Sequence, residues 1–295
     1  MQRLITGLLT LSLIIASLPA QAAPYFQGEP NYIDQQSREL AAKMLAAHGG
    51  MEPWSKAGSL QFKLFTKMIK NPMPFYSFES VNIESGAAYI DWLLFDATVA
   101  WDTEKMWSSN WPVPLPPGFF IRLTTSFMTL PWQIQADSAV VGPVSQGEIP
   151  EGGGVIYDVL RVTFEQRSPS IPGTFYDLYV DPDNGLMKAI RFDINHPGMV
   201  ANPNQPLGPN FHVFYEYRQV GGIILPTYYE SWGQGSAKGG KSNAIHVAFD
   251  ISLDTPFNSQ RLAPPENATV DQVSMDWWAG LQRRRAPANS ENTSK

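Results

Sequence analysis

Histidine is the first residue type to consider, because it serves as a metal ligand and as a general acid or base near neutral pH. The chain contains His48, His196, His212 and His246, and no two of them lie within four residues of each other. HExxH motifs and EF-hand loops are absent, so we predict no metal site and no cofactor. His48 is expected at the end of a helix, where a structural role at the last carbonyls is favoured. We expect His212 and His246 on the solvated face of their strands.

Serine, cysteine and carboxylate chemistry is equally sparse. The sequence has no cysteine and no GxSxG motif, and its glycine runs at 152–154 and 239–240 precede expected strands rather than helices. Glu79 and Asp91 could face one cleft as a glycosidase-like acid/base pair. An envelope hydrolase with such a carboxylate pair therefore stays open as an alternative to a non-catalytic protein.

Aromatic residues are abundant instead, with 16 Phe, 11 Tyr and 9 Trp among 295 residues. Most of them must fill the core. A curved sheet of this size is nevertheless commonly too wide for its own side chains to fill, which leaves an apolar pocket. The candidate ligand-binding residues are Phe62, Phe78, Trp92, Trp101, Phe120, Leu123, Phe127, Trp132, Tyr176 and Tyr215.

The elements that would position these side chains begin with a helix over 35–48. Asp34 is its expected N-cap, and Gly49 and Gly50 supply the left-handed residues that end it. A short helical turn over 52–56 follows. Strands are then expected over 59–67, 75–83, 87–95, 99–107, 154–166, 174–180, 186–195, 211–218, 223–232 and 243–252.

Short turns join these strands. The sequence Asp181-Pro182-Asp183-Asn184-Gly185 predicts a hairpin with a bulged loop, because Pro fixes φ and Gly accepts a positive φ. In the last strand, Ile245, Val247, Phe249 and Ile251 share one face. About nine to eleven antiparallel strands joined by short turns predict a mainly β fold, either a heavily curved sheet or a barrel, rather than alternating βαβ units.

One insertion interrupts the strand pattern. Between Trp111 and Trp132 a proline-rich stretch precedes an apolar segment at helical spacing, and a helix is expected over Phe119–Leu130. It could simply cover one end of the core. We favour a lid or plug that gates a cavity.

The N-terminal segment resembles an export signal. Residues 1–22 combine Arg3, an apolar run over 4–18 and the small-residue exit Ala20-Gln21-Ala22, which is typical of a cleaved signal peptide; a membrane anchor is the less favoured alternative. We expect one domain over 23–280 and a disordered tail over 281–295. A formal net charge of −6 leaves no basic excess for nucleic acid.

Two groups of motifs carry a family resemblance. The first is Ala46-Ala47-His48-Gly49-Gly50 with Trp54 and the strand 60–64; the second is Leu130-Pro131-Trp132 with the hairpin 176–186. In this order they resemble the superfamily of the periplasmic lipoprotein carriers LolA and LolB, especially its uncharacterised outer-membrane-lipoprotein-sorting-like relatives. The resemblance implies an unclosed barrel around a hydrophobic cavity, with helices as its lid. It also implies binding of acyl chains without catalysis, although the absence of Cys excludes the lipid anchor of LolB-type members.

These observations together predict a soluble periplasmic carrier for a lipid-like or acylated ligand. Envelope lipoproteins are possible partners, and no transmembrane anchor is expected after cleavage. A structural partner-binding module is the third possibility; it would show a filled barrel and a flat, exposed apolar patch.

Overall fold

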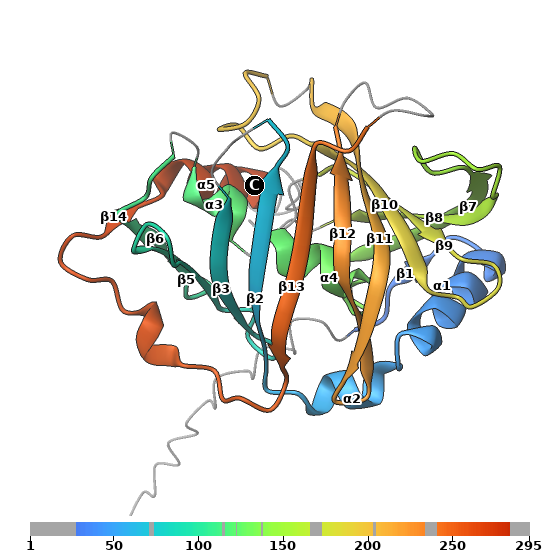
Figure 1. The fold of residues 1–295 in the computed structure, drawn as a ribbon, viewed down its shortest axis with the longest axis horizontal. Coiled ribbons are helices and arrows are strands. Elements are labelled where there is room, and N and C mark those ends of the chain that lie inside the picture. The colour runs from blue at the N-terminus through green and yellow to red at the C-terminus, as the bar shows by residue number, and fades with distance from the viewer. Residues whose placement is uncertain are drawn as a thin grey trace, which may run out of the picture.

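A computed structural model describes residues 28–70, 74–113, 116–121, 123–136, 138–165, 173–202, 205–233 and 241–283, the last six by their backbone only. Its strands form one sheet in the order β1-β7-β8-β9-β10-β11-β12-β13-β2-β3-β4-β5-β6-β14 (Figure 1). The bounds are β1 Asn31–Tyr32, β2 Ser59–Met68, β3 Phe75–Asn82, β4 Ala88–Trp92, β5 Ala97–Trp101, β6 Met106–Ser109, β7 Ala139–Gly147, β8 Tyr157–Phe164, β9 Tyr176–Val180, β10 Met187–Ile194, β11 Leu207–Val220, β12 Ile223–Trp232, β13 Ala244–Ser252 and β14 Thr269–Val270.

The predicted mainly β, unclosed barrel is confirmed, and the sheet is larger than expected. In the described ranges it has 14 strands, and all their pairs are antiparallel except the parallel pair β1–β7. The predicted segment 99–107 is a hairpin of β5 and β6. The sequence analysis missed β7, because Gly142-Pro143 interrupts its alternation where the register shifts between Val141 and Val144. It also missed β1 and β14, which are too short to show a pattern.

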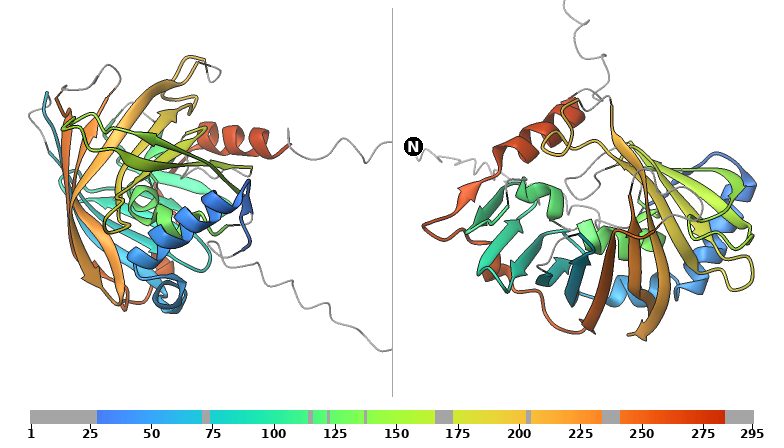
Figure 2. Two further views of the ribbon diagram at one scale, coloured as in Figure 1. Left: turned by 90° about the vertical axis from the view of Figure 1, so that its right-hand side faces the viewer. Right: turned by 45° about the horizontal axis from the view of Figure 1, so that its top comes forward.

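Five α-helices accompany the sheet in the described part of the chain, and α1 and α4 lie on its concave side (Figures 1 and 2). Their bounds are α1 Gln35–Ala47, α2 Met51–Lys56, α3 Pro117–Phe120, α4 Leu123–Gln133 and α5 Gln272–Arg283; a 3-10 helix spans Ser259–Leu262. The predicted N-cap is confirmed, since the Asp34 side chain accepts a hydrogen bond from the Ser37 N–H.

The inserted helix differs from the prediction by being two helices, since α3 ends at Phe120 and α4 begins at Leu123. The last helix, α5, was not expected. Its backbone extends over residues 281–283, the first three of the predicted tail, and the remaining tail residues lie outside the described part.

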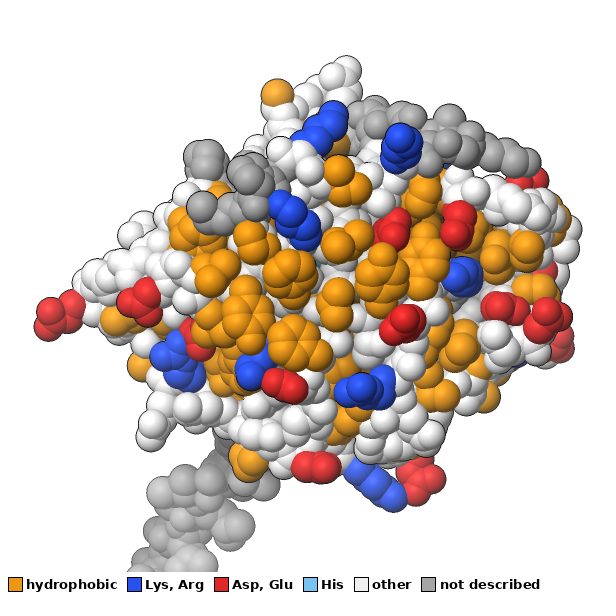
Figure 3. Space-filling model, viewed as in Figure 1, with side chains coloured by type: hydrophobic (Ala, Val, Ile, Leu, Met, Phe, Trp, Pro, Cys, Tyr) orange, Lys and Arg blue, Asp and Glu red, His pale blue; other side chains and the backbone are white. Residues whose placement is uncertain are grey.

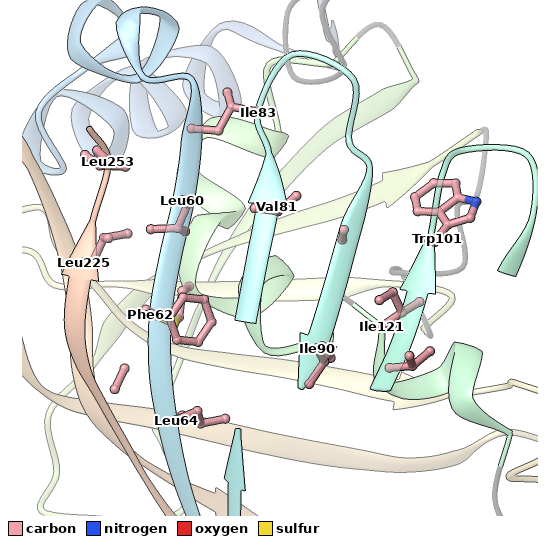
Figure 4. Packing of buried hydrophobic residues seen from close by; sticks show 14 of the residues in the cluster. Leu60, Phe62, Leu64, Val81, Ile83, Ile90, Trp101, Ile121, Leu225 and Leu253 are labelled. Atoms are coloured by element: carbon pink, nitrogen blue, oxygen red, sulfur yellow. The ribbon is translucent and has the colours of Figure 1, made fainter. Parts of the chain in front are cut away.

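Two apolar clusters occupy the concave side. The first joins β2–β6 to α2, and Figure 4 shows its strand residues around Phe62, with Ile121. The second joins β7–β12 to α1. Helix α4 belongs to both: Met128 and Trp132 pack in the first cluster, whereas Phe127, Leu130 and, one residue past the helix end, Ile134 pack in the second. These residues are spaced by three, four and seven positions along the helix, so two of its faces are apolar.

The convex face is apolar as well. Hydrophobic side chains gather across the middle of this face, with charged residues between them (Figure 3). The sequence pattern placed four residues on one face of β13, and three of them, Ile245, Val247 and Phe249, lie half-buried on the convex face. The Phe249 ring stacks on Tyr76 of β3.

The interpretation of His212 and His246 as solvated is therefore wrong. His212 is 9% exposed and packs against Phe127 of α4, and half-buried His246 is hydrogen-bonded on the concave face. Since both faces of these strands carry apolar residues, alternation alone did not distinguish the inner face from the outer one.

None of the helices in the described ranges is long and apolar enough to cross a membrane. The predicted signal peptide, residues 1–22, lies outside the described residues and stays a prediction.

Candidate ligand-binding site

Eight of the ten candidate residues share the concave side. Four stand on strands, namely Phe62, Trp92, Trp101 and Tyr176, and four stand on the inserted helices, namely Phe120, Leu123, Phe127 and Trp132. The other two, Phe78 and Tyr215, lie on the convex face. Phe78 packs beside Tyr89, and Tyr215 lies under the Lys188 ammonium group, 4.6 Å from the ring centre. One site cannot include both sets.

Half-buried aromatic residues lie in the concave site near α3. Half-buried Trp111 and Phe120 pack against Trp92 of β4, with ring centres 4.6 and 5.5 Å from it. Beyond them, in the turn between β4 and β5, Leu93 and Leu94 are 47% and 53% exposed. Aromatic contacts thus lead from an exposed turn to the first apolar cluster.

The far end of α4 is fixed at a polar junction around His48. The His48 Nδ1–H donates to the Ile224 carbonyl (2.7 Å), and Nε2 accepts from the Met187 N–H (3.0 Å). The Trp132 indole N–H donates to the Gly50 carbonyl (2.8 Å). Gly49, at φ +104°, lies against the β11–β12 turn, where a Cβ would come within 2.3 Å of the Gly222 carbonyl oxygen. His48 thus has a structural role, but its ring binds β10 and β12 instead of the last carbonyls of α1 that the sequence analysis expected. Burial lowers its pKa to about 4.

A second polar junction connects α3 to α5. The Asp271 carboxylate accepts from the Gly118 N–H and from the Ser274 hydroxyl, both at 2.7 Å, and it caps α5 through the Ser274 N–H. His196 Nδ1 accepts from the Gly198 N–H, so Nε2–H donates to the Ser274 hydroxyl. Because His196 donates and the hydroxyl proton points to Asp271, this Ser, His and Asp group does not form a nucleophilic triad.

A polar band crosses the concave face between the two apolar clusters. Its residues come from five adjacent strands and α4: Ser77, Glu79, Thr66, His246, Tyr229, Ser231, His212 and Thr124. His246 is hydrogen-bonded to Thr66 (2.9 Å) and Ser231 (2.7 Å) through its two ring nitrogens, and it stacks on Tyr229 at 4.4 Å. The His212 ring lies 5.3 Å from that of Tyr229.

Glu79 is the acid of this band. Its Oε1 accepts from the Ser77 hydroxyl at 3.0 Å. Burial raises the pKa of Glu79 to about 7, although hydrogen bonds from Ser77 and Thr124 oppose the shift. Thr124 also interacts with the Tyr229 hydroxyl, so it connects α4 to both sides of the band. Burial lowers the pKa of both His212 and His246, the latter to about 3, which keeps both rings neutral.

The suggested pair of Glu79 and Asp91 does not form. Glu79 pairs with Ile90 and points to the concave side, whereas Asp91 pairs with Phe78 and binds Arg261 and Thr98 on the convex side. Two carboxylates on opposite faces of a sheet cannot flank one glycosidic bond. The described residues also contain no group of three His, Cys, Asp or Glu that could hold a metal ion.

Sequence reasoning missed the polar band and the Asp271 junction. The strand assignment placed His212 and His246 outward, and the residues of each group come from elements far apart in the chain. The sequence nevertheless contained an indication of the polar band, because polar residues recur within strongly apolar strands and in α4. Each such side chain needs a hydrogen-bond partner if it is buried.

Comparisons with known proteins show a shared fold. No protein-family model and no curated protein sequence matches the chain. A DUF1329 family protein from Desulfovibrio piger aligns with a TM-score of 0.50 at 9% identity, covering 78% of this chain and 96% of its own. A LolA superfamily protein from Nitrosomonas europaea aligns at 0.48 and 11% identity, over 76% and 97% of the two chains. An outer membrane lipoprotein-sorting domain from Vibrio parahaemolyticus aligns at 0.40 and 12%, over 76% and 94%. The match to the DUF1329 family protein shows a shared fold and, at 9% identity, nothing beyond the fold.

Proposed function

We propose that the protein is a non-catalytic carrier that holds a lipid-like ligand between α3–α4 and the concave face of its sheet. The observation that carries this proposal is the double contact of α4, whose apolar residues pack into both clusters. Moving α4 would uncover the apolar surfaces on both sides of the polar band, which include Phe62 and Tyr176. An acyl chain laid on that surface gains about 0.8 kcal/mol per buried CH₂ group.

The inserted helices are suited to act as a gate. Among the described residues, their polar attachments to the rest of the protein are few: Gly118 to Asp271 at one end, Trp132 to Gly50 at the other, and Thr124 to the polar band. Pro131 lies inside α4, where it has no N–H for the hydrogen bond of a regular helix. Opening from the α3 end would break only the first and third of these attachments.

The direct test is ligand binding by the purified protein. We expect native mass spectrometry to detect lipid in protein from its own host, and delipidated protein to bind oleyl alcohol again. Leu123→Asp, a change at a half-buried gate residue, should alter the affinity several-fold, and Phe127→Asp at a fully buried one should alter it more. Circular dichroism identifies variants that merely unfold. Binding by neither native nor delipidated protein would overturn the proposal.

Gate motion can be followed separately, because the chain has no cysteine. Met128→Cys places a single thiol on buried α4, and Ala41→Cys places one on buried α1 as a matched control. Ligand should change the maleimide labelling rate of the first thiol several-fold and leave that of the second unchanged. Equal maleimide labelling rates at position 128 with and without ligand would contradict a gating role of α4.

The convex face favours a second candidate function, a module that binds a partner protein. Half-buried Phe65, Tyr76, Val247 and Phe249 bring apolar surface together there (Figure 3). A photo-crosslinking residue at position 247 would test this in host cells. Cross-links from position 247 and none from exposed position 218 would support it; no specific cross-link would contradict it.

A further inference from the structure

The concave polar band contains two buried atoms without a hydrogen-bond partner. They are Glu79 Oε2 and His212 Nδ1, on residues that are 3% and 9% exposed. Their neighbour His246 has partners for both ring nitrogens. Leaving a buried donor or acceptor unpaired costs about 1–3 kcal/mol. Such atoms are therefore rare in folded proteins and call for an ordered water or a ligand.

The two atoms belong to one continuous group of side chains. Thr124 connects Glu79 to the Tyr229 hydroxyl, and the His212 ring lies 5.3 Å from the Tyr229 ring. Phe127 of α4 contacts His212 edge-on, at 4.4 Å between ring centres. The unpaired atoms thus lie beside the two residues of α4, 124 and 127, that a ligand under this helix would meet.

The chemistry of the group selects among ligand heads. The charged groups that influence the pKa of Glu79, His212, Tyr229 and His246 include no Lys or Arg among the described residues. An anionic head would be buried here beside an acid and without a cation, which is strongly unfavourable. A neutral hydroxyl or amide can donate to the Glu79 oxygen and pair with the His212 nitrogen at no charge cost.

We propose that this band is a head-group subsite, which holds the uncharged hydroxyl or amide head of an apolar ligand whose chain lies along the concave face. The inference rests on the proposed carrier function and adds the chemical class of the ligand. It also assigns the two unpaired atoms a partner that the apolar clusters cannot supply.

The test uses three ligands that share one C18 chain: oleyl alcohol, oleamide and oleate. We expect the full-length protein to bind the alcohol and the amide at least tenfold more tightly than oleate at pH 7.5. His212→Leu and Glu79→Met remove the unpaired atoms while keeping similar volume, so both should fold. Each should reduce the preference to within about threefold. His212→Leu should do so by weakening alcohol and amide binding with little change in oleate affinity, whereas Glu79→Met should also strengthen oleate binding, because the buried acid is removed.

Ser80→Ala is the matched control, because Ser80 follows Glu79 but faces the convex side beside Tyr89. It should keep the wild-type preference. If the wild type binds the three ligands equally, or binds oleate most tightly, the head-group subsite is wrong while the carrier function stands. If none of the three binds, the carrier function fails and the subsite fails with it.

Discussion

Two buried polar centres lie at opposite ends of α4, and they differ in how completely their atoms are paired. At the His48 junction, both ring nitrogens and the neighbouring Met187 and Gly50 groups have hydrogen-bond partners. In the polar band, Glu79 Oε2 and His212 Nδ1 have none. Fully paired buried groups hold elements together, whereas unpaired ones raise the energy of the empty protein.

This difference separates structural residues from candidate binding residues. Both centres contain buried imidazoles whose pKa is lowered by burial, so the pKa direction alone does not distinguish them. The number of unpaired hydrogen-bonding atoms distinguishes the two centres. It also suggests that α4 is fixed at its Trp132 end and movable at its Thr124 end.

The largest expected contrast is between two histidine substitutions. His48→Leu leaves the Met187 N–H and the Ile224 carbonyl buried without partners, and should lower the free energy of unfolding by roughly 2–5 kcal/mol. His212→Leu removes an imidazole that has an unpaired nitrogen while keeping its apolar contacts, and should change it by less than about 1 kcal/mol. Urea unfolding of both variants at pH 7.5 measures the difference. Equal losses would break the comparison.

The pH dependence of stability gives a second test of the difference between the polar band and the His48 junction. Because the pKa of Glu79 is raised to about 7 in the folded protein, the folded state binds more protons than the unfolded state between about pH 4.5 and 7. Glu79 therefore favours folding below this window, and this contribution is lost as the pH rises through it. Glu79→Gln should remove the effect, so its stability relative to wild type should rise by on the order of 3 kcal/mol from pH 4.5 to 7.5.

His48 should show the opposite trend. Its folded pKa of about 4 lies below the unfolded value, so its stabilising contribution is lost as the pH falls from 6.5 to 4. Comparing each variant with the wild type at every pH separates the two groups. A flat difference curve for Glu79→Gln would mean that Glu79 is not the buried acid described above.

The α3–α5 junction should give a smaller effect. Asp271→Ala removes the cap of α5 and the acceptor for the Gly118 N–H, and should cost about 1–2 kcal/mol. Asp271→Asn retains one capping oxygen and should cost less. Thermal unfolding of both variants checks the order, and an Asn variant less stable than the Ala variant would contradict it.

Local signals predicted the fold well. The Asp34 cap, the glycines after His48 and the Asp181–Gly185 hairpin each depend on residues close in sequence, and the structure confirms all three; Asp181 N–H bonds to the Leu186 carbonyl across that turn. The missed β7 shows the limit, because Gly142-Pro143 hides a strand that its neighbour β8 stabilises through pairing.

The site was harder to predict, because its evidence is tertiary. The site combines Glu79 of β3, Thr124 of α4 and Tyr229 of β12, and no spacing in the sequence predicts that these residues lie close together. Phe78 and Tyr215 were grouped with the concave residues because aromatic character marks both faces of this sheet. Knowing which face is concave would have corrected both errors.

The smallest prediction concerns the paired member of the polar band. Thr66→Val removes one partner of His246, which is half-buried, so water can replace the lost hydroxyl and the cost should stay below about 1 kcal/mol. Thr129→Val is the matched substitution at a fully buried position of α4, where the hydroxyl donates to the Thr125 carbonyl and accepts from Gln133. Water cannot enter there without moving the helix, so this variant should cost about 1–3 kcal/mol. If Thr129→Val lowers the free energy of unfolding by less than about 1 kcal/mol, water reaches this position and α4 already opens in the ligand-free protein. The distinction between a fixed end and a movable end of α4 would then be wrong.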